Sequence, residues 1–332
     1  MALLQEIMFE SDFSDKKRLK EILLELKSRH EMKFMGAGHA VAIDRAVSYY
    51  YENAAFDEAT KGIEYYEFIK DIAANLDEKI EDVIAGLARV AGRLFTKENL
   101  ILDLTAAEDG KAALEAEIDG IIDAMYPAAE GENLHMSCEK KNEGFKTPGQ
   151  VQYVIRSGNF LDAGVPYHGS YEVLMTLLGY GYLWNEIRVK GGAYGGGISI
   201  NGLTGNAFTY SYRDPNLAET NRIYEGMPAY VENFEADERE MTKNILGTMS
   251  NVDAPMTPRM EGRRSFNAYL TGETFENVQK MRDEILATTA EDIRNSKPML
   301  EALLGADCIC TVGSAAKVEE CKELFEVVKT LM

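Results

Sequence analysis

The stretch YLWNEIRVKGGAYGGGISINGLTGNAFTYSYRDPN, residues 182–216, is the part of the sequence from which the fold can be worked out. Apolar residues recur at three- and four-residue steps over 174–187, which is the spacing of one helix face. We therefore expect a helix over 169–190. The two glycines that follow it give the backbone freedom common at helix ends. A strand is expected over 193–200, and a turn at 201–206 then starts the second strand of a β-hairpin.

The second strand of this hairpin has two different faces. Aromatic and other side chains alternate along it with the period of two that is typical of a sheet. The aromatic residues are Phe208, Tyr210 and Tyr212, and those between them are Thr209, Ser211 and Arg213. We expect one face to pack against the protein and the other to be available.

Arg188 and Tyr194 are the candidate functional residues of this stretch. Arg188 falls in the last turn of the predicted helix and Tyr194 at the start of the next strand, with two glycines between them. A guanidinium and a phenol hydroxyl are donors suited to a carbonyl oxygen that becomes negatively charged during acyl transfer. The structural alternative is that Arg188 complements a helix dipole and Tyr194 is an ordinary strand aromatic.

The composition is that of an acidic globular protein. A chain of 332 residues predicts about two domains. Fifty-five acidic against 35 basic residues leave a formal net charge of −20, which argues against nucleic acid binding and favours cationic partners. No apolar run approaches the roughly 18 to 20 residues of a membrane helix, and the N-terminus lacks a secretory signal pattern. We expect neither nucleic acid nor membrane as a partner.

The two ends of the chain share one order of elements. ENLILDLTAAEDGKAALEAEIDGI (98–121) and ADCICTVGSAAKVEECKELFEVV (306–328) each predict a strand, a small polar turn and a helix, after a pair of helices. Strand, helix and hairpin segments precede the second copy but not the first. We therefore expect two related α/β domains, the first without its opening strands, in a chain that is a piece of a longer protein.

The boundary between the two copies is expected in a charged segment rich in glycine and proline. Residues 127–149 read PAAEGENLHMSCEKKNEGFKTPG, a composition typical of a linker. The predicted domains are 1–126, mostly helical with a short strand over 100–104, and 150–332, with a closing helix that includes Val328.

A reaction centre is missing from the sequence. The four histidines are His30, His39, His135 and His168, and no HExxH or HxxEH pattern occurs. No P-loop and no GxSxG are present. The four cysteines, Cys138, Cys308, Cys310 and Cys321, form no CxxC pair, and the last three fall on predicted apolar faces, which suggests reduced core thiols.

Three motifs resemble the presequence protease branch of the pitrilysin and insulysin zinc metallopeptidases. They are NEIRVKGGAYGGG (185–197), YSYRDPN (210–216) and NVDAPMTP (251–258). The resemblance covers roughly residues 150–332 and points to the C-terminal, non-zinc half of such a protein. It implies an α/β (α+β) fold of two related pitrilysin-type domains, each with an antiparallel-rich sheet flanked by helices.

The resemblance also implies roles for named residues. In the family an arginine and a tyrosine of the C-terminal half bind the backbone of an extended peptide substrate, and they match Arg188 and Tyr194. Absence of side chains at Gly192, Gly195 and Gly196 would let that backbone lie close to the strand. Asp214 and Pro215, like Asp253 and Pro255, also match the family pattern, but turn and helix-boundary chemistry accounts for them.

The expected function is that of the substrate-binding half of a zinc metalloendopeptidase that degrades unstructured peptides. Zinc and its HxxEH motif would belong to the N-terminal half, so this chain alone is expected to be inactive and to bind no cofactor. The alternatives are a non-catalytic subunit that pairs in trans with a zinc-bearing chain, and a stand-alone peptide-binding module. The expected location is the cytoplasm, with a mitochondrial or plastid matrix as the alternative.

Overall fold

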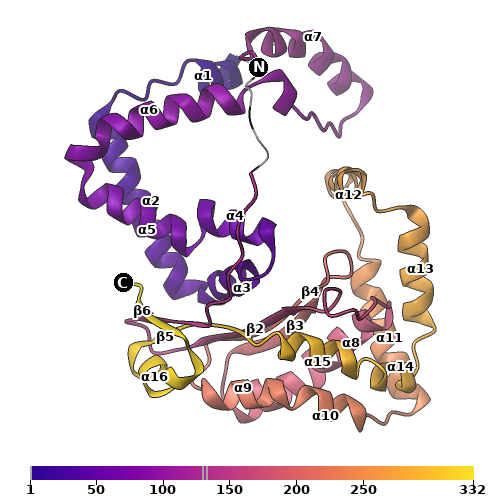
Figure 1. Cartoon of the computed structure of the whole chain (residues 1–332). Coiled ribbons are helices and arrows are strands. Elements are labelled where there is room, and N and C mark those ends of the chain that lie inside the picture. The colour runs from indigo at the N-terminus through magenta and orange to yellow at the C-terminus, as the bar shows by residue number, and fades with distance from the viewer. Residues whose placement is uncertain (1, 129–130, 132–133) are drawn as a thin grey trace. The chain divides into compact units, whose positions relative to one another are not determined.

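The computed structural model of the chain describes residues 2–128, 131 and 134–332 (Figure 1). These residues form two compact units, which we call the helical unit and the sheet unit. The helical unit consists of described residues in the segments Met1–Ser28, Glu67–Leu134 and Pro255–Thr274. The sheet unit consists of Arg29–Tyr66, His135–Ala254 and Phe275–Met332.

The helical unit is held together by its aromatic residues and its helix ends. Its helices are α1 (Ala2–Phe9), α6 (Leu76–Leu94), α7 (Glu108–Ala124) and α12 (Pro258–Thr271), while α2 (Lys16–Gly36) and α5 (Ile63–Ala74) have residues in both units. The ring of Phe9 meets the rings of Phe95 and Tyr126 edge-on, at centroid distances of 6.3 and 5.8 Å. Helix α12 starts where the Thr257 side chain accepts a hydrogen bond from the Met260 amide.

The strand predicted over 100–104 is wrong. The described residues there form no strand, and Ile101, Leu102 and Leu104 are exposed. A strand is stable only beside another strand, because its backbone groups need partners. The described residues of the helical unit offer an isolated bridge between Thr96 and Tyr126 but no strand to pair with.

One six-stranded mixed sheet lies at the centre of the sheet unit. Its strands are β1 (Glu143–Thr147), β2 (Tyr153–Asn159), β3 (Gly195–Ile200), β4 (Asn206–Tyr212), β5 (Cys308–Ser314) and β6 (Val327–Thr330). They lie in the order β3-β4-β2-β5-β1-β6. The pairs from β3 to β5 are antiparallel, whereas β1 is parallel to both β5 and β6. The α/β class and the hairpin are confirmed, but a second sheet-bearing domain does not occur among the described residues.

Two strands lie where the sequence predicted other structure. Strand β1 falls inside the predicted linker, which is therefore wrong for Glu143–Thr147. Strand β6 contains Val328, which was predicted to be helical; the preceding helix α16 is only Ala315–Glu320. Both strands are stabilised by partners distant in the sequence, and a charged strand such as β1 gives little sign of burial on its own.

Helices cover both faces of the sheet (Figure 1). On one face they are α8 (Ser170–Leu177), α9 (Ala218–Glu225), α10 (Met227–Glu232), α11 (Glu238–Val252), α13 (Phe275–Leu286), α14 (Ala290–Arg294), α15 (Lys297–Gly305) and α16. The predicted helix 290–304 is divided between α14 and α15, with proline in the first turn of α15. The opposite face packs against α3 (Gly38–Ser48), and α3 in turn contacts α4 (Glu52–Lys61).

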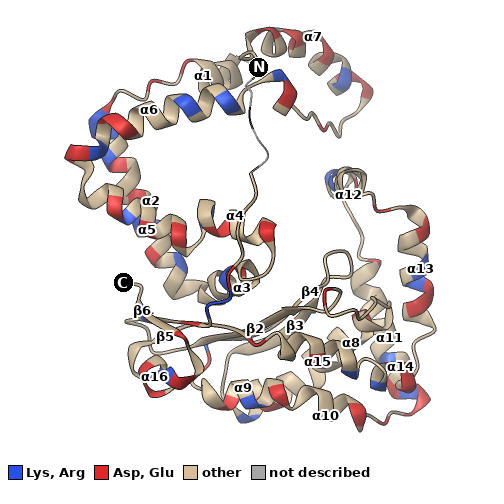
Figure 2. Cartoon of the chain, in the orientation of Figure 1, with Lys and Arg blue, Asp and Glu red and all other residues tan. Residues whose placement is uncertain are grey.

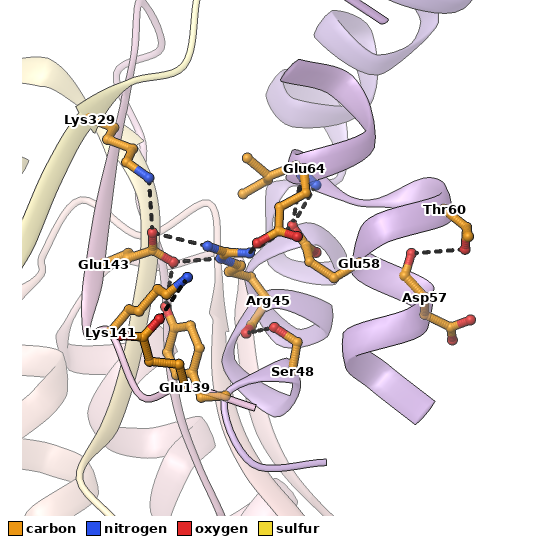
Figure 3. Close-up of polar contacts among 12 residues, drawn as sticks. Arg45, Ser48, Asp57, Glu58, Thr60, Glu64, Glu139, Lys141, Glu143 and Lys329 are labelled. Atoms are coloured by element: carbon orange, nitrogen blue, oxygen red, sulfur yellow. Dashed lines mark hydrogen bonds and ion pairs between the residues drawn. The ribbon is translucent and has the colours of Figure 1, made fainter. Parts of the chain in front are cut away.

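An ion-pair cluster fastens α3 to β1 (Figure 3). The Arg45 Nε donates to Glu143 at 2.5 Å, and its Nη1 donates to Glu64 at 2.8 Å and to Glu58 at 3.3 Å. The Tyr49 hydroxyl also donates to Glu143, at 3.1 Å. Arg45, Glu58 and Glu143 are buried. Because a buried carboxylate is tolerated only when it is paired, Arg45 explains how Glu143 can occupy a core strand.

Candidate functional site

The helix that leads to Arg188 changes its winding after α8. Residues Leu178–Tyr182 and Trp184–Lys190 are π-helical, and the Gly191 amide accordingly donates to the Glu186 carbonyl five residues back, at 2.9 Å. The helix ends at Lys190, as the sequence predicted. The π winding itself was not predicted; such turns are uncommon and are frequent at functional sites.

Two glycines reverse the chain after this helix. Gly192 has a φ of +81°, a left-handed conformation that favours glycine. A Cβ on Gly191 would lie 2.6 Å from the Ile187 carbonyl oxygen, so a side chain does not fit there. The reversal returns the backbone to the end of the helix, where the Ala193 amide donates to Ile187 at 3.1 Å.

The DPN segment, Asp214 to Asn216, fixes this reversal from behind. The Asn216 Nδ2 donates to the Gly191 carbonyl at 2.7 Å. Asp214 is buried and accepts hydrogen bonds from the Asn216 amide at 2.8 Å and from the Thr220 hydroxyl at 2.6 Å. Burial raises the pKa of Asp214. The turn chemistry inferred for Asp214 therefore fits, with the addition that it supports the loop between Arg188 and Tyr194.

Arg188 and Tyr194 lie together at the surface. The Arg188 Nη1 donates to the Tyr194 backbone carbonyl at 2.6 Å, and the guanidinium carbon lies 5.3 Å from the centre of the Tyr194 ring. On its other side the guanidinium lies 4.3 Å from the centre of the Trp184 ring. The Tyr194 residue is 64% exposed. Sequence reasoning found the pair but missed Trp184, which lies one helical turn before Arg188 and was assigned only to the packed helix face.

Strand β3, which follows Tyr194, is an edge strand. Among the described residues it pairs with β4 alone. The Asn201 amide donates to the Asn206 carbonyl at 2.9 Å, and because antiparallel pairs alternate, Gly196 and Ile198 direct their backbone groups away from β4. An open row of amide and carbonyl groups is a template for an added strand.

The predicted glycines serve three different purposes. Gly192 provides the left-handed turn described above. A Cβ on Gly196 would lie 3.1 Å from the Tyr210 carbonyl and 3.2 Å from the Ile187 side chain, so this glycine lets the helix approach the strand. A Cβ on Gly195 would meet nothing within 4 Å, so this position leaves open surface beside Tyr194.

Charge is absent from the two strands beside the site. Figure 2 shows β3 and β4 entirely in tan, while acidic and basic residues colour helices such as α13 and α16. On β4 the aromatic side chains are half-buried, and Thr209 and Ser211 on the opposite face are fully buried. The face available on this strand is thus the aromatic one.

The histidines and cysteines take no part in the site as a metal centre. Within residues 2–128, 131 and 134–332, no group of three or more histidine, cysteine, aspartate or glutamate side chains is arranged to hold a metal ion. His135 contacts Glu52, and His168 contacts Ser170. Cys308, Cys310 and Cys321 are buried free thiols, and Cys138 is exposed. None of the helices in the described part of the chain has the length and apolar character needed to span a bilayer.

Known proteins share this sequence and fold. The family model described as "PreP C-terminal domain" matches residues 142–306, and a second model, of a region associated with the same peptidase subfamily, matches residues 1–72. Protein HypA of Clostridium perfringens is 35% identical over 331 residues, which are 99% of this chain and 34% of the relative. Presequence protease 1, chloroplastic/mitochondrial, of Arabidopsis thaliana is 30% identical over 338 residues, covering 99% of this chain and 31% of the relative.

A solved structure supports the same assignment at the level of the fold. The crystal structure of pitrilysin superposes with a TM-score of 0.56 at 13% identity, over 93% of this chain and 32% of that one. The chain thus spans about a third of the length of the relatives it matches. Together these matches show that the chain belongs to the presequence protease branch of the pitrilysin-like peptidases and corresponds to the C-terminal region of that branch.

Proposed function

We propose that this chain is the substrate-binding C-terminal part of a zinc metalloendopeptidase that degrades unstructured peptides. The names of its relatives motivate the activity, and the fraction of their length that it spans assigns it to one part of such an enzyme. The sequence has no HxxEH motif, so zinc and the activation of water are assigned to the N-terminal half. Residues 150–332 would be the pitrilysin-type C-terminal domain and 1–126 the remainder of the domain before it.

The observation that carries this proposal is the exposed Arg188–Tyr194 pair at the start of an open edge strand. One N–H of the guanidinium is used by the Tyr194 carbonyl, and arginine has five. An extended peptide beside β3 would place its carbonyls near the guanidinium and the phenol hydroxyl of Tyr194. Donors fixed in this way stabilise negative charge that develops on a substrate carbonyl. Gly195 leaves room for the peptide backbone.

Peptide binding to the isolated chain tests the proposal. Fluorescence anisotropy of a labelled unstructured peptide should show that Arg188→Ala weakens binding by roughly tenfold or more, as expected for a charge-assisted hydrogen bond. Lys190→Ala is the matched control, because it removes a positive charge from the same helix end. Equal losses in both variants would indicate attraction by charge alone and contradict the proposed role.

A cleavage assay tests the second part of the proposal. The isolated chain with added zinc should not cleave a fluorogenic peptide. Turnover that disappears in Arg188→Ala would show a reaction centre within this chain and overturn the assignment of zinc to the N-terminal half.

We further propose that the protein resides in the cytoplasm. The three buried thiols are free, which suits a reducing compartment.

A further inference from the structure

A row of aromatic side chains faces the open edge of the sheet. Tyr212, Tyr210 and Phe208 of β4 pair directly with Gly195, Gly197 and Ser199 of β3. Directly paired residues project from the same face of a sheet. Each aromatic residue therefore has a glycine or a serine between it and the open edge.

The ring of Tyr210 covers Gly197. A Cβ built on Gly197 would lie 3.0 Å from the Tyr210 Cε1 and hydroxyl oxygen and 3.1 Å from Cζ. The ring can take this position only because residue 197 has no side chain. It thus extends from β4 across β3 towards the edge, where it remains half-buried.

Neighbouring rings hold Tyr210 in place. The centre of the Phe208 ring lies 6.4 Å from that of Tyr210, and the His39 ring of α3 lies 6.3 Å away on the other side. Phe208 and Tyr210 both pack at the border of the core beneath α3 and are only partly buried. We call Gly197, Tyr210 and Phe208 the edge aromatic surface.

A peptide added to β3 as a further strand would place every second side chain on this same face. Across β3 those side chains would find glycine rather than a bulky residue, and then the Tyr210 ring. An apolar ring that is already half-desolvated favours an aromatic or large aliphatic partner. The absence of charge from β3 and β4 leaves this face without a partner for a charged side chain.

We propose that the edge aromatic surface is a side-chain subsite that selects an aromatic or large aliphatic residue of the bound peptide. Tyr210 is the specificity-determining residue, and Gly197 is the residue that lets its ring reach the peptide. The subsite rests on the proposed function, because it requires an extended peptide along β3. Arg188 and Tyr194 hold the backbone, whereas the edge aromatic surface distinguishes one side chain from another.

Two labelled peptides that differ only in their alternate residues test this subsite. One carries phenylalanine at every second position and the other alanine, with the same serine residues between, so either strand register presents the same side chains to Tyr210. By anisotropy the wild-type chain should bind the phenylalanine peptide roughly threefold to tenfold more tightly, the range that an aromatic pair supplies.

Variants of Tyr210 and Gly197 assign this preference. Tyr210→Phe should keep it, and Tyr210→Ala should reduce the affinity ratio to about one while changing the affinity for the alanine peptide little. Gly197→Ala should also lower the ratio, because the added methyl group displaces the ring; this variant decides the question if Tyr210→Ala does not fold. Tyr269→Ala, which removes a tyrosine that is 82% exposed on α12, is the control and should keep the ratio.

The outcomes separate the subsite from the proposed function. A ratio that is unchanged in both Tyr210→Ala and Gly197→Ala, or a wild-type chain that binds both peptides equally, overturns the subsite and leaves peptide binding in place. A wild-type chain that binds neither peptide overturns both proposals. Arg188→Ala should weaken both peptides by the same factor and leave the ratio intact.

Discussion

Arg45 and Glu143 form a buried two-point contact between residues 98 positions apart, with Nε and Nη2 of the guanidinium donating to the two carboxylate oxygens at 2.5 and 3.1 Å. Helix α3 is thereby fixed to a central part of the sheet. The same helix carries His39, whose ring lies 4.7 Å from that of Tyr212, and Tyr212 in turn meets the Tyr194 ring at 5.7 Å. The cluster and the candidate site therefore share one supporting helix.

Arg45→Met should destabilise the sheet unit by about 3–5 kcal/mol, because it leaves the buried Glu143 carboxylate without its main partner. The measurement is urea unfolding followed by circular dichroism. Adding Glu143→Gln to Arg45→Met should recover part of the loss, since the charge is then gone. Lys16→Ala, which breaks an exposed pair with Glu81, is the control and should change stability by less than about 1 kcal/mol. A similar loss in both single variants would show that Arg45 has no special role.

Acid should remove the contribution of Glu143. Burial alone would raise its pKa, but the hydrogen bonds and charge of Arg45, with the charge of Lys329, outweigh burial and hold the pKa below the usual 4.5. A carboxylate whose folded pKa is depressed adds stability above its unfolded pKa and loses it as the pH falls through the folded value. The stability difference between wild type and Glu143→Gln should therefore be constant near pH 6 and shrink below about pH 4.5.

The comparison with Glu143→Gln is necessary because a neighbouring carboxyl acts in the opposite direction. Burial raises the pKa of Glu58 despite the nearby Arg45 charge, so protonation of Glu58 costs less in the folded state. Its effect is common to both proteins and largely cancels in the difference. A difference that grows on acidification would contradict the assignment for Glu143.

Gly192→Ala and Gly195→Ala should have opposite effects. Alanine at position 192 must adopt a φ of +81°, so we expect a loss of stability of about 1 kcal/mol or more. Alanine at position 195 meets nothing within 4 Å and should leave the melting temperature almost unchanged, yet its methyl group occupies the surface proposed for the peptide backbone. Calorimetry and peptide anisotropy on both variants check this, and normal peptide binding by Gly195→Ala would argue against that surface.

Trp184→Ala should weaken peptide binding by roughly twofold to fivefold, because the guanidinium of Arg188 loses the ring on one side. Trp184→Phe keeps an aromatic face and should retain most of the affinity. The effect should vanish when Arg188→Ala is already present, since Trp184 acts through that guanidinium. Persistence of the full Trp184→Ala effect in the Arg188→Ala background would show that Trp184 contacts the peptide itself or acts elsewhere.

Asn216→Ala removes the hydrogen bond to the Gly191 carbonyl and should loosen the chain reversal between Arg188 and Tyr194. We expect a stability loss of about 1 kcal/mol and a several-fold loss of peptide affinity. Asn244→Ala is the matched control, because its amide also donates to a backbone carbonyl, within α11. Affinity that falls equally in the two variants would reflect general destabilisation rather than positioning of the loop.

The features that local sequence determines were predicted well. The helix end at Lys190, the glycine reversal and the hairpin follow from periodicity and glycine placement within one short stretch. Strand β1 was missed because Glu143 looks like a linker residue until Arg45 is placed beside it. The strand at 100–104 was predicted wrongly because its apolar residues have no neighbouring strand in the described structure. The link from His39 to Tyr212 depends on α3 crossing the sheet, which no local pattern reveals.

The uncharged margin formed by β3 also bears on how copies of the chain behave in solution. A sheet edge without lysine, glutamate or proline lacks the residues that usually discourage edge-to-edge pairing between molecules. Mutual repulsion from a formal net charge of −20 then becomes the main force that keeps copies apart, and dissolved salt weakens it. Self-association through β3 is therefore expected to rise with ionic strength, and an occupying peptide should suppress it.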